Sequence, residues 1–187
     1  GPLHVLRAEA PDEGVPELLP ARQGVTACVV LTGSRRWTDE APVRAVLDEV
    51  VRRDVPLVLG DNPNGLDAMA LRLARQAGLD PDVHEADWDR YGLAAGPKRN
   101  GEMVRAGLRF DHPVLVAFPD EKSKGTRDCV RQATATKRFV VIDAGRAGPR
   151  SVGMAVAEAL DERAAVRPVD CSVDGRCAAA PRQPRLH

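Results

Sequence analysis

The chain has 187 residues, with 27 basic and 27 acidic side chains and therefore a formal net charge of zero. Its hydrophobic fraction of 43% and charged fraction of 29% are ordinary for a globular domain, which excludes collagen-like, coiled-coil and wholly disordered chains. The zero net charge argues against a nucleic acid as the partner, because proteins dedicated to nucleic acids carry a strong basic excess.

The composition changes along the chain and separates one domain from two terminal segments. Residues 1–23 carry several prolines among acidic and small residues, so we expect a flexible N-terminal arm. Residues 167–187 hold prolines, arginines and two cysteines with no period, so we expect a disordered C-terminal tail. A single domain at 24–166 remains. It is long enough to bury a hydrophobic core without disulfides or a structural metal ion.

The sequence shows no membrane or export signal. Its apolar runs are far shorter than the ~20 residues that a membrane helix needs. The N-terminus has no basic stretch followed by an apolar one. We therefore expect a cytoplasmic protein without membrane contact.

The cysteines and histidines do not form a metal-binding pattern. Cys28 lies in a strand-like run and Cys129 in a helix-like one, so both are expected to be buried as small apolar residues. Cys171 and Cys177 lie close together in the tail, where a disulfide is one alternative and two free thiols are the favoured one. No second pair supplies further zinc ligands. We predict neither a metal nor another cofactor.

Strand-like and helix-like stretches alternate through the domain. Short apolar runs predict strands, and apolar residues at helical spacing predict helices. The predicted order is strand 25–31, a helix from a cap at Thr38 or Asp39 to Val51, strand 55–59, helix 66–77, a weaker strand 82–86, helix 97–108, strand 113–118, helix 126–136, strand 139–142 and a last helix that begins at Ser151.

This alternation predicts an α/β protein. Continuous apolar strands that alternate with helices form a parallel sheet covered by helices on both faces. Right-handed crossovers then give a single-domain, Rossmann-like, doubly wound sheet. Ligands of such sheets bind at the carboxyl ends of the strands, where the winding reverses. The loops expected to form the site are therefore 32–38, 60–66, 87–97 and 119–126.

Aromatic residues gather at these loops. Of six in the chain, Trp37, Trp88, Tyr91 and Phe118 lie in or beside them. Aromatic side chains ordinarily pack in the core. Their position indicates either a wall for a flat ligand, such as a nucleobase, or rings that close the end of the sheet. Both alternatives stay open for Trp88 and Tyr91, and packing is favoured for Phe118.

Two glycine-containing turns predict a phosphate site. Gly33-Ser34-Arg35 follows the first strand, and Gly125-Thr126-Arg127 opens the helix after the fourth. Backbone amides near glycine, a helix N-terminus and a hydroxyl group together bind anions, although Gly-Thr is also an ordinary cap. The dinucleotide-binding, P-loop and nucleophile-elbow motifs are absent, which disfavours dehydrogenases, P-loop NTPases and α/β-hydrolases.

A third signal is a pair of cations at the start of a helix. Lys98 and Arg99 follow Pro97, and positive charge is disfavoured at a helix N-terminus unless an anion or acidic partner compensates it. Violations of local rules tend to mark functional sites. The alternative is that both side chains point into solvent, and it is favoured more for Lys98 than for Arg99.

Five short motifs resemble a known family. They are Gly33-Ser34-Arg35-x-Trp37-x-Asp39, Gly65-x-Asp67-x-x-Ala70, Trp88-x-x-Tyr91-Gly92, Ala95-Gly96-Pro97-x-Arg99-Asn100-x-x-Met103, and Ala117-Phe118-Pro119 with Gly125-Thr126. Over about residues 25–142 the chain resembles the YspA-like branch of the SLOG superfamily, which also holds the DNA-processing protein DprA and the LOG proteins. The resemblance implies a Rossmann-like fold and a nucleotide or nucleotide-derived ligand. It also implies a homodimer or larger assembly.

The resemblance also implies roles for single residues. Gly33, Ser34, Gly125 and Thr126 would surround the phosphate, and Arg99 matches the arginine of the family's second motif. The complete set of expected ligand-binding residues is Gly33, Ser34, Arg35, Trp37, Gly65, Trp88, Tyr91, Arg99, Asn100, Phe118, Gly125 and Thr126.

Two departures from the family pattern bear on catalysis. LOG proteins hydrolyse the N-glycosidic bond of nucleoside 5′-monophosphates with a Gly-Gly-x-Gly-Thr-x-x-Glu motif. Here Asp120 and Glu121 replace the glycine pair, and Cys129 stands at the glutamate position with Asp128 one residue earlier. After the second strand, Asp61 stands where a glycine pair is usual and would repel a phosphate unless a cation intervenes.

We therefore expect a nucleotide-binding protein. The alternative is a LOG-like phosphoribohydrolase, with Asp67 or Asp128 as its carboxylate and Arg99 as the electrostatic partner. A third possibility is a structural or partner-binding module with a degenerate pocket.

Overall fold

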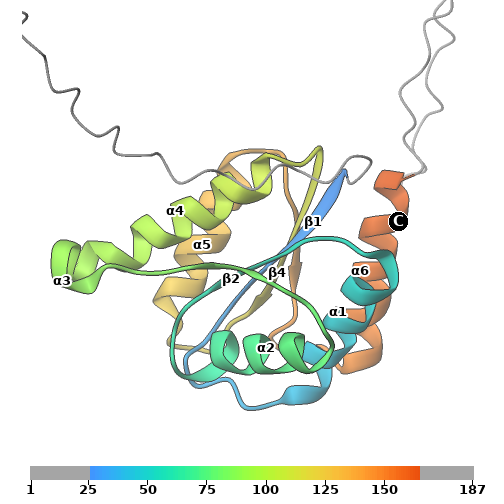
Figure 1. The fold of residues 1–187 in the computed structure, drawn as a ribbon, viewed down its shortest axis with the longest axis horizontal. Helices are drawn as coiled ribbons and strands as arrows, with labels where there is room; N and C mark the ends of the chain where they lie inside the picture. Colours follow the sequence, from blue (N-terminus) through green and yellow to red (C-terminus); the bar gives the residue numbers. More distant parts are fainter. Residues whose placement is uncertain (1–25, 165–187) are drawn as a thin grey trace, which may run out of the picture.

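The computed structural model describes residues 26–164 and shows a parallel sheet between two layers of helices (Figure 1). Within these residues the sheet has five strands in the order β3-β2-β1-β4-β5. The strands are β1 (Ala27–Gly33), β2 (Leu57–Gly60), β3 (Asp82–His84), β4 (His112–Phe118) and β5 (Val140–Asp143). All neighbouring pairs are parallel, and the winding reverses between β1 and β4.

Helices cover both faces of the sheet, which confirms the predicted doubly wound, Rossmann-like α/β architecture (Figure 1). One face packs on α1, α2 and α6, and the other on α4 and α5. The helices are α1 (Glu40–Arg53), α2 (Gly65–Gln76), α3 (Trp88–Tyr91), the short 3-10 helix η1 (Gly92–Ala94), α4 (Ala95–Leu108), α5 (Lys124–Ala135) and α6 (Pro149–Ala164).

Alternation along the central strand produces the two cores. Val29 and Leu31 of β1 are buried against α1, α2 and α6, whereas Cys28 and Val30 are buried on the opposite face against α4 and α5. Successive side chains of a strand point to opposite faces, so a strand covered on both sides is apolar at every position. This is why β1 is a continuous apolar run in the sequence.

The two cysteines of the described region are buried and free, as expected. Burial raises the pKa of the Cys28 thiol to about 12 and that of Cys129 to about 11. Both behave as small core residues. The predicted arm at 1–23, the tail at 167–187, and Cys171 and Cys177 in it lie outside the described residues.

Several helix boundaries differ from the sequence prediction. Asp39 caps α1, where its side chain accepts a hydrogen bond from the Ala41 N–H at 3.2 Å. Helix α4 begins at Ala95 and not at Pro97. Proline is tolerated there because the first four N–H groups of a helix have no intrahelical acceptor in any case. Helix α5 begins at Lys124, and the loop at 87–97 contains α3 and η1, which the sequence did not predict.

The apolar face of α1 is covered within the chain. Val43, Val46 and Val50 are fully buried, with α6 packed alongside. The homodimer itself stays a prediction.

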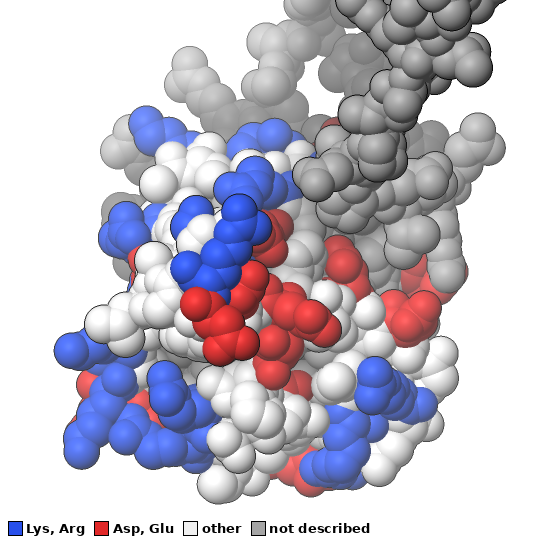
Figure 2. Space-filling model, turned by 60° about the vertical axis from the view of Figure 1, so that its left-hand side comes forward, with Lys and Arg blue, Asp and Glu red and all other residues white. Residues whose placement is uncertain are grey.

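The surface carries charges of both signs. Figure 2 shows one face on which acidic side chains gather in the middle and basic side chains lie around them. None of the helices of residues 26–164 is long and apolar enough to cross a bilayer. Within the same range, no group of histidine, cysteine and acidic residues is arranged to hold a metal ion.

Candidate functional site

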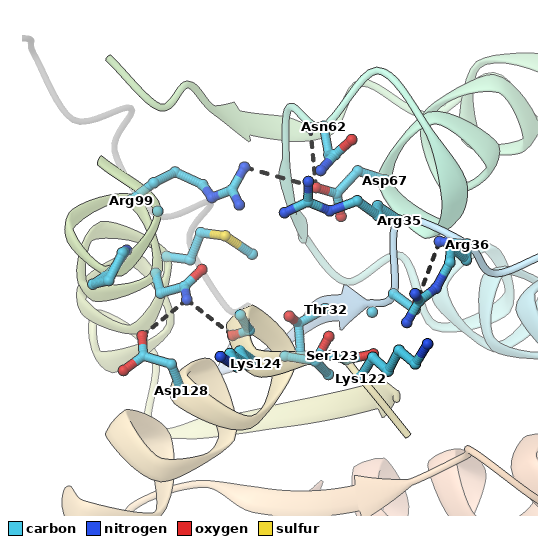
Figure 3. Close-up of a pocket in the computed structure, with 18 of the residues that line it drawn as sticks. Thr32, Arg35, Arg36, Asn62, Asp67, Arg99, Lys122, Ser123, Lys124 and Asp128 are labelled. Atoms are coloured by element: carbon cyan, nitrogen blue, oxygen red, sulfur yellow. Dashed lines mark hydrogen bonds and ion pairs between the residues drawn. The ribbon is translucent and has the colours of Figure 1, made fainter. Parts of the chain in front are cut away.

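A cavity of about 620 Å³ opens where the winding of the sheet reverses (Figure 3). The register of β1 and β4 pairs Gly33 with Phe118, so the loops that follow the two strands lie side by side at the carboxyl edge of the sheet. Volumes of this size are typical of small-molecule sites. The cavity is therefore at the position that the fold predicts for a ligand.

Most of the expected site residues line this cavity. They are Gly33, Ser34, Arg35, Asp67, Trp88, Arg99, Asn100, Gly125, Thr126 and Asp128. Ten further lining residues were not among the expected site residues: Thr32, Arg36, Asn62, Leu93, Gly96, Pro97, Met103, Lys122, Ser123 and Lys124. Three of them, Gly96, Pro97 and Met103, belong to the motif that contains Arg99 and Asn100. Three others, Thr32, Arg36 and Lys124, adjoin an expected residue in the chain.

The start of α5 presents backbone amides without a side-chain cap. Ser123 is the N-cap residue, but its side chain makes no cap hydrogen bond and instead donates to Asp120 Oδ1 at 2.7 Å. The first-turn N–H groups of Gly125 and Thr126 therefore receive no acceptor from it. A Cβ built on Gly125 would meet nothing within 4 Å. The space over this helix start is open to a ligand atom.

The backbone of Ser34 joins three loops at the floor of the cavity. Its N–H donates to the Phe118 carbonyl at 2.9 Å. Its carbonyl accepts from the N–H groups of Trp37 at 3.1 Å and Leu66 at 3.0 Å. One residue thus connects the segment after β1 with the end of β4 and the start of α2.

The side chain of Ser34 is already engaged. Its hydroxyl donates to Asp120 Oδ2 at 2.6 Å and accepts from the Arg36 N–H at 3.0 Å. We expected this hydroxyl to donate to a phosphate, and the structure corrects that role because the proton goes to Asp120. Ser34 positions the loops around the cavity.

Asp61 and Asp67, which follow β2, form a partly buried charged group with Arg99 of α4. Arg99 Nη1 lies 2.7 Å from Asp61 Oδ1 and 3.8 Å from Asp67 Oδ2 (Figure 3). A Cβ at Gly60 would lie 2.6 Å from Asp67 Oδ2 and 2.9 Å from Arg99 Nη1, so glycine is required at the end of β2. The cation that offsets Asp61 is therefore Arg99.

The Asp67 carboxyl has an altered acidity. Burial raises its pKa above the ordinary value and the nearby Asp61 adds to this, while Arg99 and the Asn62 N–H, 3.1 Å away, oppose it. Asp67 is the third residue of α2, but its hydrogen bond goes to an amide before the helix. It combines burial, cavity contact and a cationic neighbour, which are features of functional carboxyl groups.

Asp128 is held by neighbouring side chains. Its carboxylate accepts from Asn100 Nδ2 at 3.0 Å, from Gln132 Nε2 at 2.8 Å and from the Arg131 guanidinium. Burial alone would raise its pKa, but these hydrogen bonds together lower it. Asn100 also donates to the Gly125 carbonyl at 3.1 Å. Asp128 and Asn100 thus fasten α4 to α5, and Asp128 is held as an anion.

Trp37 and Phe118 lie away from the cavity. Phe118 is fully buried in the core, and its ring centroid lies 5.1 Å from that of Trp37 in an edge-to-face arrangement. Trp37 Nε1 donates to the Asp39 carbonyl at 2.6 Å. Both rings close the end of the sheet. The expectation that Phe118 contacts the ligand is wrong, because β4 directs it toward α1, α2 and α6.

Gly65 and Tyr91 also do not line the cavity. Gly65 has φ +65°, and a Cβ there would lie 2.3 Å from the Ser34 carbonyl oxygen, so this glycine permits the turn before α2. Tyr91 lies on the surface, where Lys98 Nζ lies 4.4 Å from its ring centroid. This cation–π contact accounts for Lys98, whose side chain does not line the cavity.

Comparisons with known proteins found a family model, a protein of related sequence and a solved structure. The sequence model of the YspA, cpYpsA-related SLOG family matches residues 27–91. The Gene 61 protein of Mycobacterium phage D29 is 44% identical over 112 residues, which are 56% of this chain and 86% of that protein.

A solved structure is also similar. The X-ray structure of DNA processing protein A (DprA) from Streptococcus pneumoniae has a TM-score of 0.48 and 14% sequence identity. The match covers 73% of this chain and 56% of the DprA chain, so this chain spans about half of that protein's length.

The parallel sheet with its cavity at the winding reversal defines a Rossmann-like domain. The chain belongs to the YspA, cpYpsA-related SLOG family. Membership of this family suggests binding or processing of nucleotide-related molecules.

Proposed function

We propose that this protein binds a nucleotide or nucleotide-derived small molecule, with a phosphate against the start of α5. The observation that carries this proposal is the uncapped first turn of α5 beneath the open space at Gly125. Amides at a helix N-terminus point toward an anion, and the helix dipole adds partial positive charge. Lys122 and Lys124 line the same part of the cavity and add full charges.

The other side of the cavity fits the remainder of a nucleotide. Asn62 and Asp67 line it with an amide and a carboxyl group, which hydrogen-bond readily to sugar hydroxyls. Trp88 also lines it and is 50% exposed, with its ring against Gly96. A base stacked on an aromatic ring gains about 1–3 kcal/mol. Trp88 is the side chain that can provide such a contact here.

The proposal is tested by comparing nucleoside monophosphates with the matching nucleosides. Ligand at a hundredfold excess over its dissociation constant should stabilise the fold by about 2.7 kcal/mol, and the nucleoside should do far less. Gly125→Asp should abolish monophosphate binding in a folded protein, because its carboxylate occupies the phosphate position. Unchanged monophosphate affinity in that variant contradicts the proposal.

One observation favours a second candidate function, hydrolysis of an N-glycosidic bond. Asp67 lines the cavity beside Arg99, and burial raises its pKa, as in carboxylic acids that donate a proton to a leaving group. Asp128 is less suited to that role because its oxygens are occupied by Asn100, Gln132 and Arg131. We favour binding without hydrolysis, and the two are separated by assaying release of the free base.

Two expectations about partners accompany this proposal. We expect a homodimer or larger assembly, and light scattering at high concentration that returned the 20.1 kDa mass of one chain would contradict it. We expect no nucleic-acid partner, and a gel-shift titration at physiological salt tests this directly.

A further inference from the structure

Four basic side chains line the cavity. Arg35 and Arg36 follow β1, and Lys122 and Lys124 lie at the β4–α5 connection. The hydrogen bond between Ser34 and Asp120 holds these two segments together. Figure 3 shows Lys122 and Lys124 in the lower half of the view, whereas Asp67, Arg99 and Arg35 lie in the upper half.

Only part of this positive charge is compensated within the protein. Arg36 pairs with Asp120 at 2.7 Å. Among residues 26–164, no ion pair joins Arg35, Lys122 or Lys124 to a carboxylate. All three side chains are exposed at the cavity, so they can move to meet a ligand. Like charges gathered without a counterion repel one another, so an anionic ligand would relieve this.

The other end of the cavity carries little net charge. Arg99 is shared between the carboxyl groups of Asp61 and Asp67, at 2.7 and 3.8 Å. Arg35 lies on the same side of the view as Asp67 (Figure 3), so two acidic groups face two guanidinium groups there. The excess positive charge is therefore at the basic end, which Lys122, Lys124 and the start of α5 form. It favours the phosphates there, and the sugar is directed toward Asp67.

The amount of charge exceeds what one phosphate requires. A phosphate monoester carries about 1.5 to 2 negative charges at neutral pH. The two unpaired lysines and the roughly half positive charge of a helix N-terminus together exceed that value. We infer that the ligand carries at least two linked phosphates, as in a nucleoside diphosphate, a nucleoside triphosphate or a dinucleotide joined through a pyrophosphate. This inference rests on the proposed function.

The inference is tested by calorimetric titration with the mono- and diphosphates of adenosine, guanosine, cytidine and uridine. Buffers are free of divalent metal and kept at one ionic strength. For the base that binds, we expect the diphosphate to bind at least tenfold more tightly than the monophosphate. We also expect inorganic pyrophosphate to bind more tightly than inorganic phosphate, which tests the basic end without any base.

Variants assign the extra affinity to the basic end. Lys122→Gln with Lys124→Gln should reduce the diphosphate preference below about threefold, while circular dichroism shows an intact fold. Arg75→Gln is the matched control, because this exposed arginine lies in the last turn of α2 and does not line the cavity. It should leave the preference unchanged.

The possible outcomes are distinguishable. Equal affinity for the mono- and diphosphate of one base overturns the inference and leaves the proposed function standing. A diphosphate preference that persists in the double lysine variant also overturns it, since the second phosphate would then lie elsewhere. Failure of every nucleotide and of both inorganic anions to bind contradicts the proposed function itself.

Discussion

Asp120 bridges the loops after β1 and β4, where its carboxylate accepts the hydroxyl proton of Ser34 at 2.6 Å. It also accepts from the Arg36 guanidinium through two contacts of 2.9 Å. Hydrogen bonds from Ser34, then Ser123 and Arg36, hold the pKa of the Asp120 carboxyl well below its ordinary value. An internal anion therefore occupies the position of the family's glycine pair and organises the basic end of the cavity.

The first prediction follows from this carboxylate. A carboxyl group whose pKa is depressed by folding stabilises the native state above its unfolded pKa, near 3.9, and loses this effect as the pH falls further. Asp120→Asn should therefore lower the free energy of unfolding at pH 7, and the difference from the unsubstituted protein should shrink below about pH 4. Urea unfolding at several pH values measures it. Asp111→Asn, at an exposed carboxylate before β4, is the control. If the stability difference between Asp120→Asn and the unsubstituted protein does not vary with pH, the pKa of Asp120 is not lowered by folding.

The second prediction concerns Gly125. A Cβ there has open space, and alanine in place of a helical glycine stabilises by about 0.5–1 kcal/mol. Gly125→Ala should therefore not destabilise the fold, yet it should weaken nucleotide binding because the methyl group fills the phosphate position. Gly153→Ala in α6 is the matched control, with a Cβ at 3.5 Å from that of Ala45. Thermal unfolding and calorimetric titration measure both effects. Unweakened binding in Gly125→Ala would exclude close approach of the ligand to this backbone.

The third prediction separates binding from hydrolysis. We expect no release of free base from any nucleoside monophosphate above background, measured by chromatography. Asp67→Asn and Asp128→Asn should both fold and bind nucleotide. Asp128→Asn should lower the stability more than Asp67→Asn, by about 1–3 kcal/mol, since the Asp128 carboxylate accepts hydrogen bonds from three side chains. Base release by the unsubstituted protein that disappears in either folded variant would establish the hydrolase.

The fourth prediction concerns an ion pair at the edge of the sheet. On β3, His84 Nε2 lies 3.0 Å from Asp82 Oδ2, and this hydrogen bond raises the pKa of His84 despite its partial burial. A histidine whose pKa is raised by folding stabilises the native state fully below its unfolded pKa, near 6.5, and less as the pH rises through the native value. The stability lost on His84→Gln should therefore be larger at pH 6 than at pH 8.5. Guanidinium unfolding at both pH values checks this, and an equal loss at both would contradict it.

The sheet could be predicted because its determinants are local. Each central strand is a continuous apolar run, and the crossover rule then fixes which loops meet. That reasoning brings Gly33 and Gly125 to one cavity. The position of Phe118 was also readable in principle. It shares the alternation of Val114 and Val116 on β4, which marks the face covered by α1, α2 and α6.

The contacts between loops could not be predicted in the same way. Ser34 and Asp120 are 86 residues apart, and nothing in either segment indicates that one accepts the other's proton. The same holds for Arg99. Its positive charge is disfavoured near the start of a helix, but in the structure it forms an ion pair with Asp61. A cation at a helix N-terminus indicates that an acidic partner or an anion compensates it. Only the folded structure shows that this partner is Asp61.

The position of Ser34 has a consequence for how the protein would meet its ligand. Because its N–H and carbonyl already join the segment after β1 to the end of β4 and the start of α2, these parts need not become ordered when a ligand arrives. Binding then loses little conformational entropy in the floor of the site, and such preorganisation favours affinity. The amide hydrogens of Ser34, Trp37 and Leu66 should accordingly exchange slowly with solvent even in the ligand-free protein, while those of Gly125 and Thr126 should exchange rapidly until an anion covers them.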